Sequence, residues 1–151
     1  MPFTGSIVGT KCASSDGDNT GCGVKSTANN TFGSLFNKQA GGVIAHRVDN
    51  TGIAVWYFAR DQVPADITAG NPNPTGWPTP VALFSDDGCD ISSHFQKHQL
   101  ILDITLCGGF GDATYGQEAT GSCPGTCAQA VADPQNFKFA QFKIASISVY
   151  Q

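Results

Sequence analysis

The clearest pattern in this chain is a series of short apolar runs that are separated by polar turns. Residues 42–48 and 53–58 are rich in β-branched and aromatic side chains, and the link between them, 49–52, reads Asp-Asn-Thr-Gly. Two such runs joined by a short Asp/Asn/Gly link are typical of a β-hairpin. We therefore predict two paired strands over 42–58.

Later runs continue the strand pattern. Residues 81–84 are short and apolar, and 99–107 carry Leu and Ile at every second position. The last run, 139–150, alternates apolar and polar residues from 142 onward. One apolar and one polar face are typical of a strand in an antiparallel sheet. A single short helix is expected around 128–132, ending before a proline. Together these patterns predict an all-β sandwich.

The segments between the runs predict long Pro- and Gly-rich loops. Residues 10–31 contain many turn-forming residues, and 108–122 are rich in Gly. Residues 59–80 contain five prolines, which exclude a regular helix or a central strand there.

Length and charge narrow the class of protein. The chain has 151 residues, which fits one domain over 1–151. The net charge is −4, so electrostatics gives no reason to expect nucleic acid or an anionic membrane as a partner. No apolar stretch reaches the roughly 18 residues that a membrane-spanning helix needs.

Six cysteines predict disulfides and hence an oxidising, extracellular location. Cys123 and Cys127 have the close spacing of zinc ligands, but no second pair matches them, so no metal is expected. Six cysteines allow 15 pairings, which the sequence alone does not resolve. The preferred set is Cys12–Cys22, Cys123–Cys127 and Cys89–Cys107.

The chain also carries a signal for N-glycosylation. Asn29-Asn30-Thr31 is an acceptor triplet for a glycan on Asn29, whereas proline excludes Asn73-Pro74-Thr75. The first residues lack the basic and apolar regions of a signal peptide. The sequence is therefore expected to be a mature or recombinant form of a secreted protein.

Motifs along nearly the whole chain occur in a fixed order. They are Gly41–Val43, Val55–Arg60, Asn73–Pro80, Cys89–Gln99, Thr105–Gly108, Cys123–Cys127 and Ile147–Tyr150. This order resembles the C-terminal half of fungal glycoside hydrolase family 16, the laminarinase-like endo-β-1,3(4)-glucanases. The resemblance implies a concanavalin-like jelly roll, here truncated, whose substrate cleft lies on the concave face.

The catalytic part of that family has no counterpart in the sequence. Glycoside hydrolysis normally needs two carboxylates across the scissile bond. The family carries them in a Glu-x-Asp-x-x-Glu strand, and no segment here matches it. The single glutamate, Glu118, lies in a Gly-rich loop without an acidic neighbour two residues away, which is typical of a surface carboxylate. No catalytic residue and no cofactor are therefore predicted.

Three side chains are candidates for contact with sugar. Phe110 follows the strand of residues 99–107, where family members often have Trp. His46 lies on the first hairpin strand, and Tyr57 lies on the second. The alternative for each is a structural role, and the same holds for His94 and His98, which are four residues apart but outside a long helix.

The sequence thus predicts a catalytically deficient, secreted domain with a weak β-glucan-binding or surface-interaction role. Exposed strand edges predict a homo-oligomer. One alternative is an active endo-β-1,3(4)-glucanase that uses unusual carboxylates, such as Asp103 with Asp49 or Asp112. Another is a secreted fungal protein that acts on host or immune cells through protein–protein contact.

Overall fold

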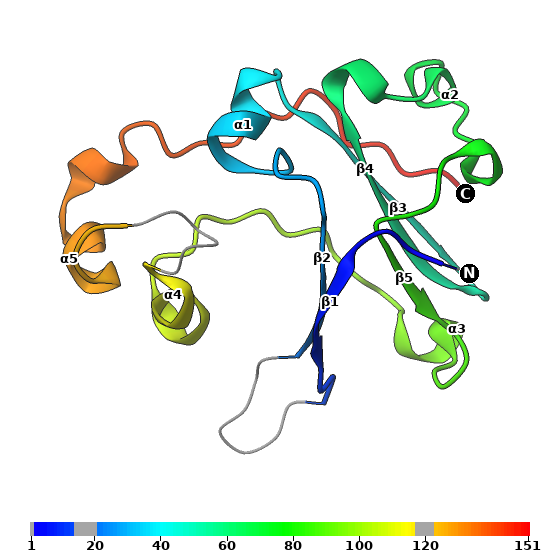
Figure 1. Cartoon of the computed structure of the whole chain (residues 1–151), viewed down its shortest axis with the longest axis horizontal. Helices are drawn as coiled ribbons and strands as arrows, with labels where there is room; N and C mark the ends of the chain where they lie inside the picture. Colours follow the sequence, from blue (N-terminus) through cyan, green and yellow to red (C-terminus); the bar gives the residue numbers. More distant parts are fainter. Residues whose placement is uncertain (1, 14–20, 117–122) are drawn as a thin grey trace. The chain divides into compact units, whose positions relative to one another are not determined.

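A computed structural model describes residues 2–13, 21–116 and 123–151, without the side chains of Phe110, Ala113 and Thr114 (Figure 1). The chain divides into two compact units, Met1–His98 and Gln99–Gln151. We call them the first and the second unit and describe each by itself. Glu118 lies outside the described residues. No helix in the described part of the chain is long and apolar enough to cross a membrane.

The first unit contains two antiparallel sheets. One pairs β1 (Ser6–Thr10) with β2 (Cys22–Lys25), and the disulfide Cys12–Cys22 closes this ribbon as predicted. The other has the order β3-β4-β5. Its strands are β3 (Gly42–Asp49), β4 (Gly52–Ala59) and β5 (Ala82–Ser85).

The predicted hairpin is confirmed, and its turn explains the register. Asp49 pairs with Gly52, and the carboxylate of Asp49 accepts hydrogen bonds from the backbone N–H and the hydroxyl of Thr51 at 2.8 and 2.6 Å. Gly52 has φ +136°, and a Cβ there would lie 2.4 Å from the carbonyl oxygen of Phe84. Only glycine therefore fits where β4 leaves the turn beside β5.

One face of the three-stranded sheet, which we call the packed face, carries the core of the first unit. Ala54, Trp56 and Phe58 of β4 are buried there, at 1–4% exposure. Their cover comes from the Pro-rich segment of residues 60–80, which has no strand and instead contains short helical turns. These turns are η1 (Arg60–Gln62), α2 (Ala65–Thr68) and η2 (Pro74–Gly76).

Trp77 fixes that segment onto the sheet. Its ring meets those of Trp56 and Phe58 edge to face, with centroids 5.2 and 5.3 Å apart. Its indole N–H donates to a carboxylate oxygen of Asp66 at 2.8 Å, and the indole N–H of Trp56 donates to the carbonyl oxygen of Pro78 at 2.7 Å. The apolar rings are thus buried while each indole keeps a hydrogen-bond acceptor.

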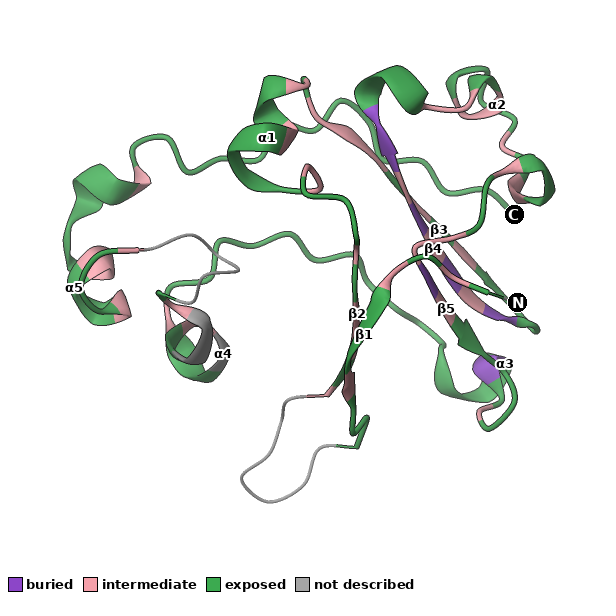
Figure 2. Cartoon of the chain, in the orientation of Figure 1, coloured by how far each residue is buried: buried purple, intermediate pink, exposed green. Residues whose placement is uncertain are grey.

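The opposite face of the same sheet, which we call the open face, is only partly covered. Strand pairing and alternation place Ile44 opposite Tyr57, His46 opposite Val55, and Val48 opposite Ile53 on this face. Phe84 of β5 pairs with Ile53 and joins them. Ile44 is 60% exposed, Val48 56% and Phe84 39%. Figure 2 shows that buried residues of the sheet are concentrated on β4, whereas the residues of β3 are exposed or half-buried.

The two strands predicted over 99–107 and 139–150 are wrong. In the second unit these residues run without strand structure, and their apolar side chains are exposed, including Leu100 at 71% and Val149 at 85%. An alternating pattern becomes a strand only when another strand satisfies its backbone N–H and C=O groups. No described residue supplies that pairing here.

The described residues of the second unit form helices instead of strands. They are α4 (Gly108–Thr114), α5 (Cys127–Ala132) and η4 (Pro134–Phe137), while the first unit also has α1 (Gly33–Lys38) and α3 (Ile91–His94). The predicted helix near 128–132 is confirmed as α5. It begins at Thr126, whose hydroxyl accepts the N–H of Gln129, while the Gln129 side chain accepts the N–H of Thr126.

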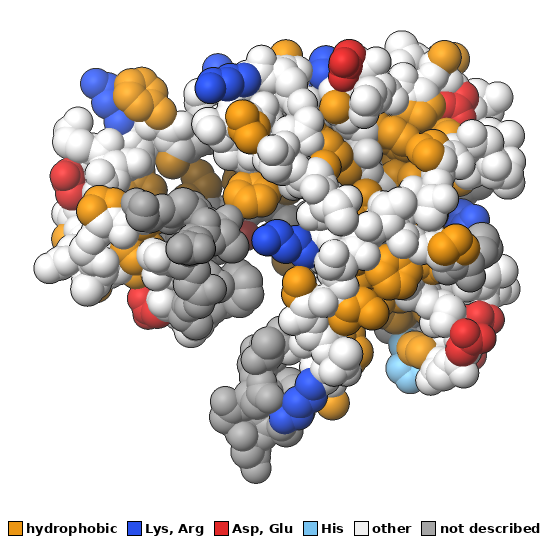
Figure 3. Space-filling model, in the orientation of Figure 1, with side chains coloured by type: hydrophobic (Ala, Val, Ile, Leu, Met, Phe, Trp, Pro, Cys, Tyr) orange, Lys and Arg blue, Asp and Glu red, His pale blue; other side chains and the backbone are white. Residues whose placement is uncertain are grey.

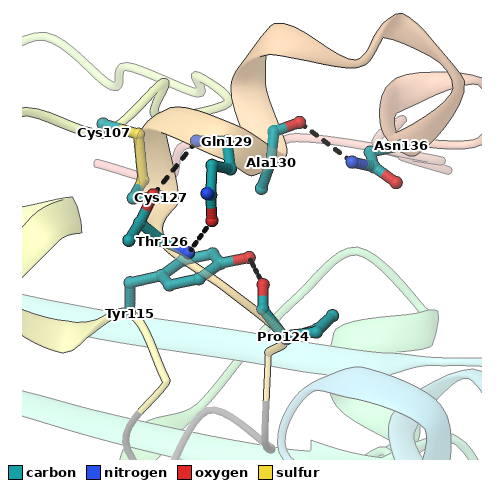
Figure 4. Close-up of a disulfide and its surroundings, with 8 residues drawn as sticks. All are labelled: Cys107, Tyr115, Pro124, Thr126, Cys127, Gln129, Ala130 and Asn136. Carbon is teal, nitrogen blue, oxygen red and sulfur yellow. Dashed lines mark hydrogen bonds between the residues drawn. A yellow bond between two sulfur atoms is a disulfide. The ribbon is translucent and has the colours of Figure 1, made fainter.

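Two features of the second unit differ from expectation. The first part of the Gly-rich segment is a helix, α4, and not a loop. The disulfide joins Cys107 to Cys127, so the predicted pairs Cys89–Cys107 and Cys123–Cys127 are wrong (Figure 4). The cross-link joins the start of α4 to the start of α5, a contact that depends on tertiary structure and not on sequence spacing. Cys89 and Cys123 carry free thiols.

Trp77 provides the first test of this packing. Trp77→Ala should lower the free energy of unfolding by about 3 kcal/mol, since it leaves Trp56 and Phe58 without their edge-to-face partner. Trp77→Phe should cost about 1 kcal/mol, because it keeps a ring but removes the donor to Asp66. Denaturation followed by circular dichroism measures both. Phe32→Ala, at a side chain that is 62% exposed, is the matched control and should change little. An equal effect of all three variants would contradict the assigned role of Trp77.

The stability of the first unit should also depend on pH. The hydrogen bond from the backbone N–H of Asn73 is the main cause that lowers the pKa of Asp66; desolvation opposes it, and the indole of Trp77 adds a further lowering. A pKa that is lower in the folded state adds stability above the unfolded value of about 3.9. That stability is lost as the pH falls through the folded value. Asp66→Asn should therefore reduce the loss of stability between pH 5 and pH 2, roughly the range in which the carboxylate is protonated. An unchanged pH profile would contradict this assignment.

Candidate functional site

The open face brings two of the three candidate sugar contacts together. His46 on β3 pairs with Val55, and Tyr57 on β4 pairs with Ile44, so the two candidates lie on one face at neighbouring pairs of the ladder. His46 is exposed and Tyr57 is half-buried. The third candidate, Phe110, lies in α4 of the second unit, and its side chain falls outside the described residues.

A shallow hollow of about 280 Å³ lies on this face. Its walls are mainly apolar, and its polar hydroxyls come from Ser26, Thr31 and Tyr57. Figure 3 shows hydrophobic side chains reaching the surface in patches over this part of the molecule. No carboxylate is among the described residues that line the hollow. It can therefore bind through packing and hydroxyl contacts, but its lining offers no group for carboxylate acid–base chemistry.

Tyr57 is held by a network that the sequence did not reveal. Its hydroxyl donates to the carbonyl oxygen of Asn30 at 2.7 Å and accepts from the amide of Gln39. The same Gln39 amide oxygen accepts from the side chain of Asn30 at 2.6 Å, and the ring of Phe36 lies 6.4 Å from that of Tyr57. The ring is therefore fixed in orientation, while its hydroxyl already has protein partners. No spacing or motif signals this network, because it joins a loop, a helix end and a strand.

The described aspartates serve mainly local structure. Asp49 holds the hairpin turn, Asp66 holds Trp77, and Asp90 accepts the N–H of Ser92 at the start of α3. In each case a hydrogen bond is the leading cause that lowers the pKa of the carboxyl: the Thr51 hydroxyl, the Asn73 N–H and the Ser92 hydroxyl, respectively. A glycosidase general acid needs the opposite, a raised pKa. These three groups are therefore unsuited to that role.

The histidines and cysteines do not form a metal site within the described residues. His94 Nδ1 lies 2.9 Å from the carbonyl oxygen of Asp90, and His98 stacks on Phe95 with ring centroids 5.5 Å apart. Both contacts fit the structural role. Cys107, Asp112 and Cys127 are close enough for ligands, with atoms within 4.8 Å. The two sulfurs are bonded to each other, so neither is the thiolate that a metal requires.

Comparison with known proteins identifies the class. Residues 2–150 match the family described as "XgeA-like, catalytic GH16 domain". The fold is that of the all-β jelly-roll sandwiches of this family, as two solved structures show. The chain therefore belongs to glycoside hydrolase family 16.

Three similar proteins define the extent of the match. A probable glycosidase of Schizosaccharomyces pombe is 39% identical over 153 residues, covering 99% of this chain and 36% of that protein. An elongating family 16 β-1,3-glucosyltransferase is 35% identical with a TM-score of 0.77, over 91% of this chain and 48% of that one. Laminarinase 16A of Phanerochaete chrysosporium, solved with two β-glucans in its donor and acceptor sites, is 34% identical with a TM-score of 0.72, over 89% and 46%. The chain thus spans less than half the length of each of these proteins.

The role of Tyr57 can be tested directly. Tyr57→Phe should lower the free energy of unfolding by about 1 kcal/mol, since the carbonyl of Asn30 and the amide of Gln39 both lose a partner. The matched control is Tyr115→Phe, whose hydroxyl donates to the carbonyl oxygen of Pro124 at 3.0 Å on the exposed surface of the second unit. That control should cost less, because water can replace an exposed hydrogen bond. Equal losses in thermal or chemical denaturation would contradict the buried network.

Proposed function

We propose that this chain is a catalytically deficient family 16 domain that binds β-glucan weakly and acts outside the cell. The observation that carries the proposal is the lack of the family's carboxylate residues in the sequence. The 151 residues contain one glutamate and no Glu-x-Asp-x-x-Glu strand. A scaffold of this family without its two carboxylates retains surfaces for sugar but not the groups that cleave it.

The open face supports the binding part of the proposal. A sugar ring presents an apolar C–H surface and a rim of hydroxyls, and it matches a shallow apolar hollow with a few polar groups. Tyr57 offers a ring of fixed orientation, and His46 offers an exposed imidazole beside it. Phe110 is a separate candidate for an aromatic contact with sugar, on the second unit. Similarity to a laminarinase solved with β-glucans supports the choice of ligand.

The extracellular location is supported by the disulfides and by fungal relatives. Two disulfides, Cys12–Cys22 and Cys107–Cys127, require an oxidising environment. The match to a fungal probable glycosidase and to the laminarinase of a fungus is consistent with work on polysaccharide outside the cell.

Glucan binding tests the proposal. The chain should bind laminarin with a dissociation constant near about 1 mM, as expected for few contacts in a shallow hollow. His46→Ala and Phe110→Ala should each weaken binding about fivefold, the equivalent of roughly 1 kcal/mol for a lost ring contact. Calorimetry or affinity electrophoresis measures these changes.

Two substitutions serve as matched controls for the binding experiment. His98→Ala removes a histidine outside the open face, and Phe139→Ala removes a phenylalanine of the second unit that is 81% exposed. Neither should change laminarin binding. Absence of binding by the folded wild-type chain would reject the glucan proposal and favour the alternative, a role in protein–protein contact.

We also propose that the chain self-associates. Ile44, Val48 and Phe84 expose apolar surface on the open face, and β3 and β5 are the edges of their sheet. Apolar faces and unpaired strand edges are stabilised when another protein surface covers them. A second copy of the chain offers the same surface in return. The occupant we propose is therefore a second copy of this chain.

Sedimentation velocity at several concentrations tests self-association. Wild-type protein should show a dimer or larger species whose fraction rises with concentration. Val48→Lys should shift it toward monomer, because a charge would be buried in the interface. Val8→Lys, at a β1 side chain that is 60% exposed, is the matched control and should have no such effect. A wild-type chain that remains monomeric throughout would contradict the proposal.

A further inference from the structure

The loop between β2 and α1 contains two neighbouring asparagines in different environments. They belong to Asn29-Asn30-Thr31, the one triplet of the chain with the Asn-x-Ser/Thr pattern and no proline in its middle. Such a triplet occurs often by chance, so its meaning depends on the structure around it.

Asn30 is fixed to the protein. Its side-chain amide donates to Gln39 at 2.6 Å, and its carbonyl oxygen accepts from the Tyr57 hydroxyl at 2.7 Å and from the Gln39 amide at 3.3 Å. These bonds tie the loop to the C-terminal end of α1 and to β4. The position of the triplet is therefore defined by contacts between residues that are far apart in sequence.

Asn29 is the opposite case. Its side chain is exposed at a bend and makes no hydrogen bond within the described part of the chain. The loop before it is shaped locally, since the N–H of Ala28 donates to the Ser26 hydroxyl at 3.1 Å. A group attached to the Asn29 amide would thus point into solvent and break no contact of the fold.

The other Asn-x-Thr triplet provides an internal comparison. At Asn73-Pro74-Thr75 the asparagine side chain accepts from both the N–H and the hydroxyl of Thr75, at 3.3 and 2.6 Å. The Asn73 side chain is thus already hydrogen-bonded within the protein, and the middle proline excludes this triplet from the acceptor pattern. Sequence and structure therefore agree: Asn29 fits the acceptor pattern and is exposed, whereas Asn73 does not fit it and is hydrogen-bonded.

We propose that Asn29 is N-glycosylated. The inference rests on the proposed extracellular location, because the donor is a lipid diphosphate-linked oligosaccharide of the secretory pathway. The amide nitrogen of Asn29 forms a bond to the anomeric carbon of the first sugar. The bond from that carbon to the phosphate oxygen breaks, the lipid diphosphate leaves, and the amide loses one proton. The glycan then stands two residues from Thr31, which lines the hollow of the open face.

The experiment is secretion of the full chain, fused to a cleavable leader, from a eukaryotic host, followed by mass spectrometry. Enzymatic removal of the glycan converts a glycosylated Asn to Asp. The change should appear in the tryptic peptide of residues 26–38 and not in that of residues 61–97, which contains Asn73. On gels, wild type and Thr31→Ser should shift on glycan removal, whereas Asn29→Gln and Thr31→Ala should not.

Further measurements test whether Asn29 is free of contacts with the fold and whether the chain has entered the oxidising compartment. Asn29→Gln should leave the melting temperature of the unglycosylated chain unchanged, while Asn30→Ala should lower it, because only Asn30 is bonded to the fold. Formation of the Cys12–Cys22 disulfide in the same preparation reports entry into the oxidising compartment. An unmodified 26–38 peptide in a sample with that disulfide formed would overturn the proposal. Laminarin binding by unglycosylated protein tests the proposed function independently.

Discussion

The packing of Trp77 against Trp56 and Phe58 is the interaction on which the first unit depends. Few side chains of the described residues are buried, and Trp56 and Phe58 are the largest of them. Trp77 comes from a Pro-rich segment that has no strand of its own and is held in place by Asp66. Because this contact, with the hydrogen bond from Trp56 to Pro78, joins the segment to the sheet, it also fixes which face of the sheet is packed and which is open. The candidate site exists on the open face as a consequence.

Exposed apolar surface underlies both the proposed self-association and the proposed sugar site. A family 16 sandwich has two sheets, and a sheet buries its apolar face against another layer. The chain corresponds to 46–48% of two solved family members, and within the described residues the open face is only partly covered, while the runs at 99–107 and 142–150 are exposed. The same surface that invites a second copy also includes the hollow proposed for sugar. The proposed self-association and the proposed glucan binding would therefore compete for one face.

What the sequence could predict depended on how local the determining contacts are. The hairpin of residues 42–58, the helix at α5 and the Cys12–Cys22 bridge were predictable because turn residues, caps and short spacing act over a few positions. The strand at 99–107 failed because alternation does not supply a pairing partner, and the Cys107–Cys127 bridge failed because it joins two helices. In the site, the sequence indicated that His46 and Tyr57 lie on the two hairpin strands, but only the strand register shows that they share one face. The bonds of Tyr57 to Asn30 and Gln39 were not foreseeable, since no motif encodes contacts between a loop, a helix end and a strand.

We have proposed that this chain retains the family scaffold without the family's catalytic chemistry. Reducing-sugar release from laminarin and lichenan by the purified, folded chain is the measurement that decides this. We expect no release above a protein-free control at any pH. Release that Asp103→Asn or Glu118→Gln abolishes would contradict it, because it would show that a working carboxylate has been rebuilt at a position outside the family motif.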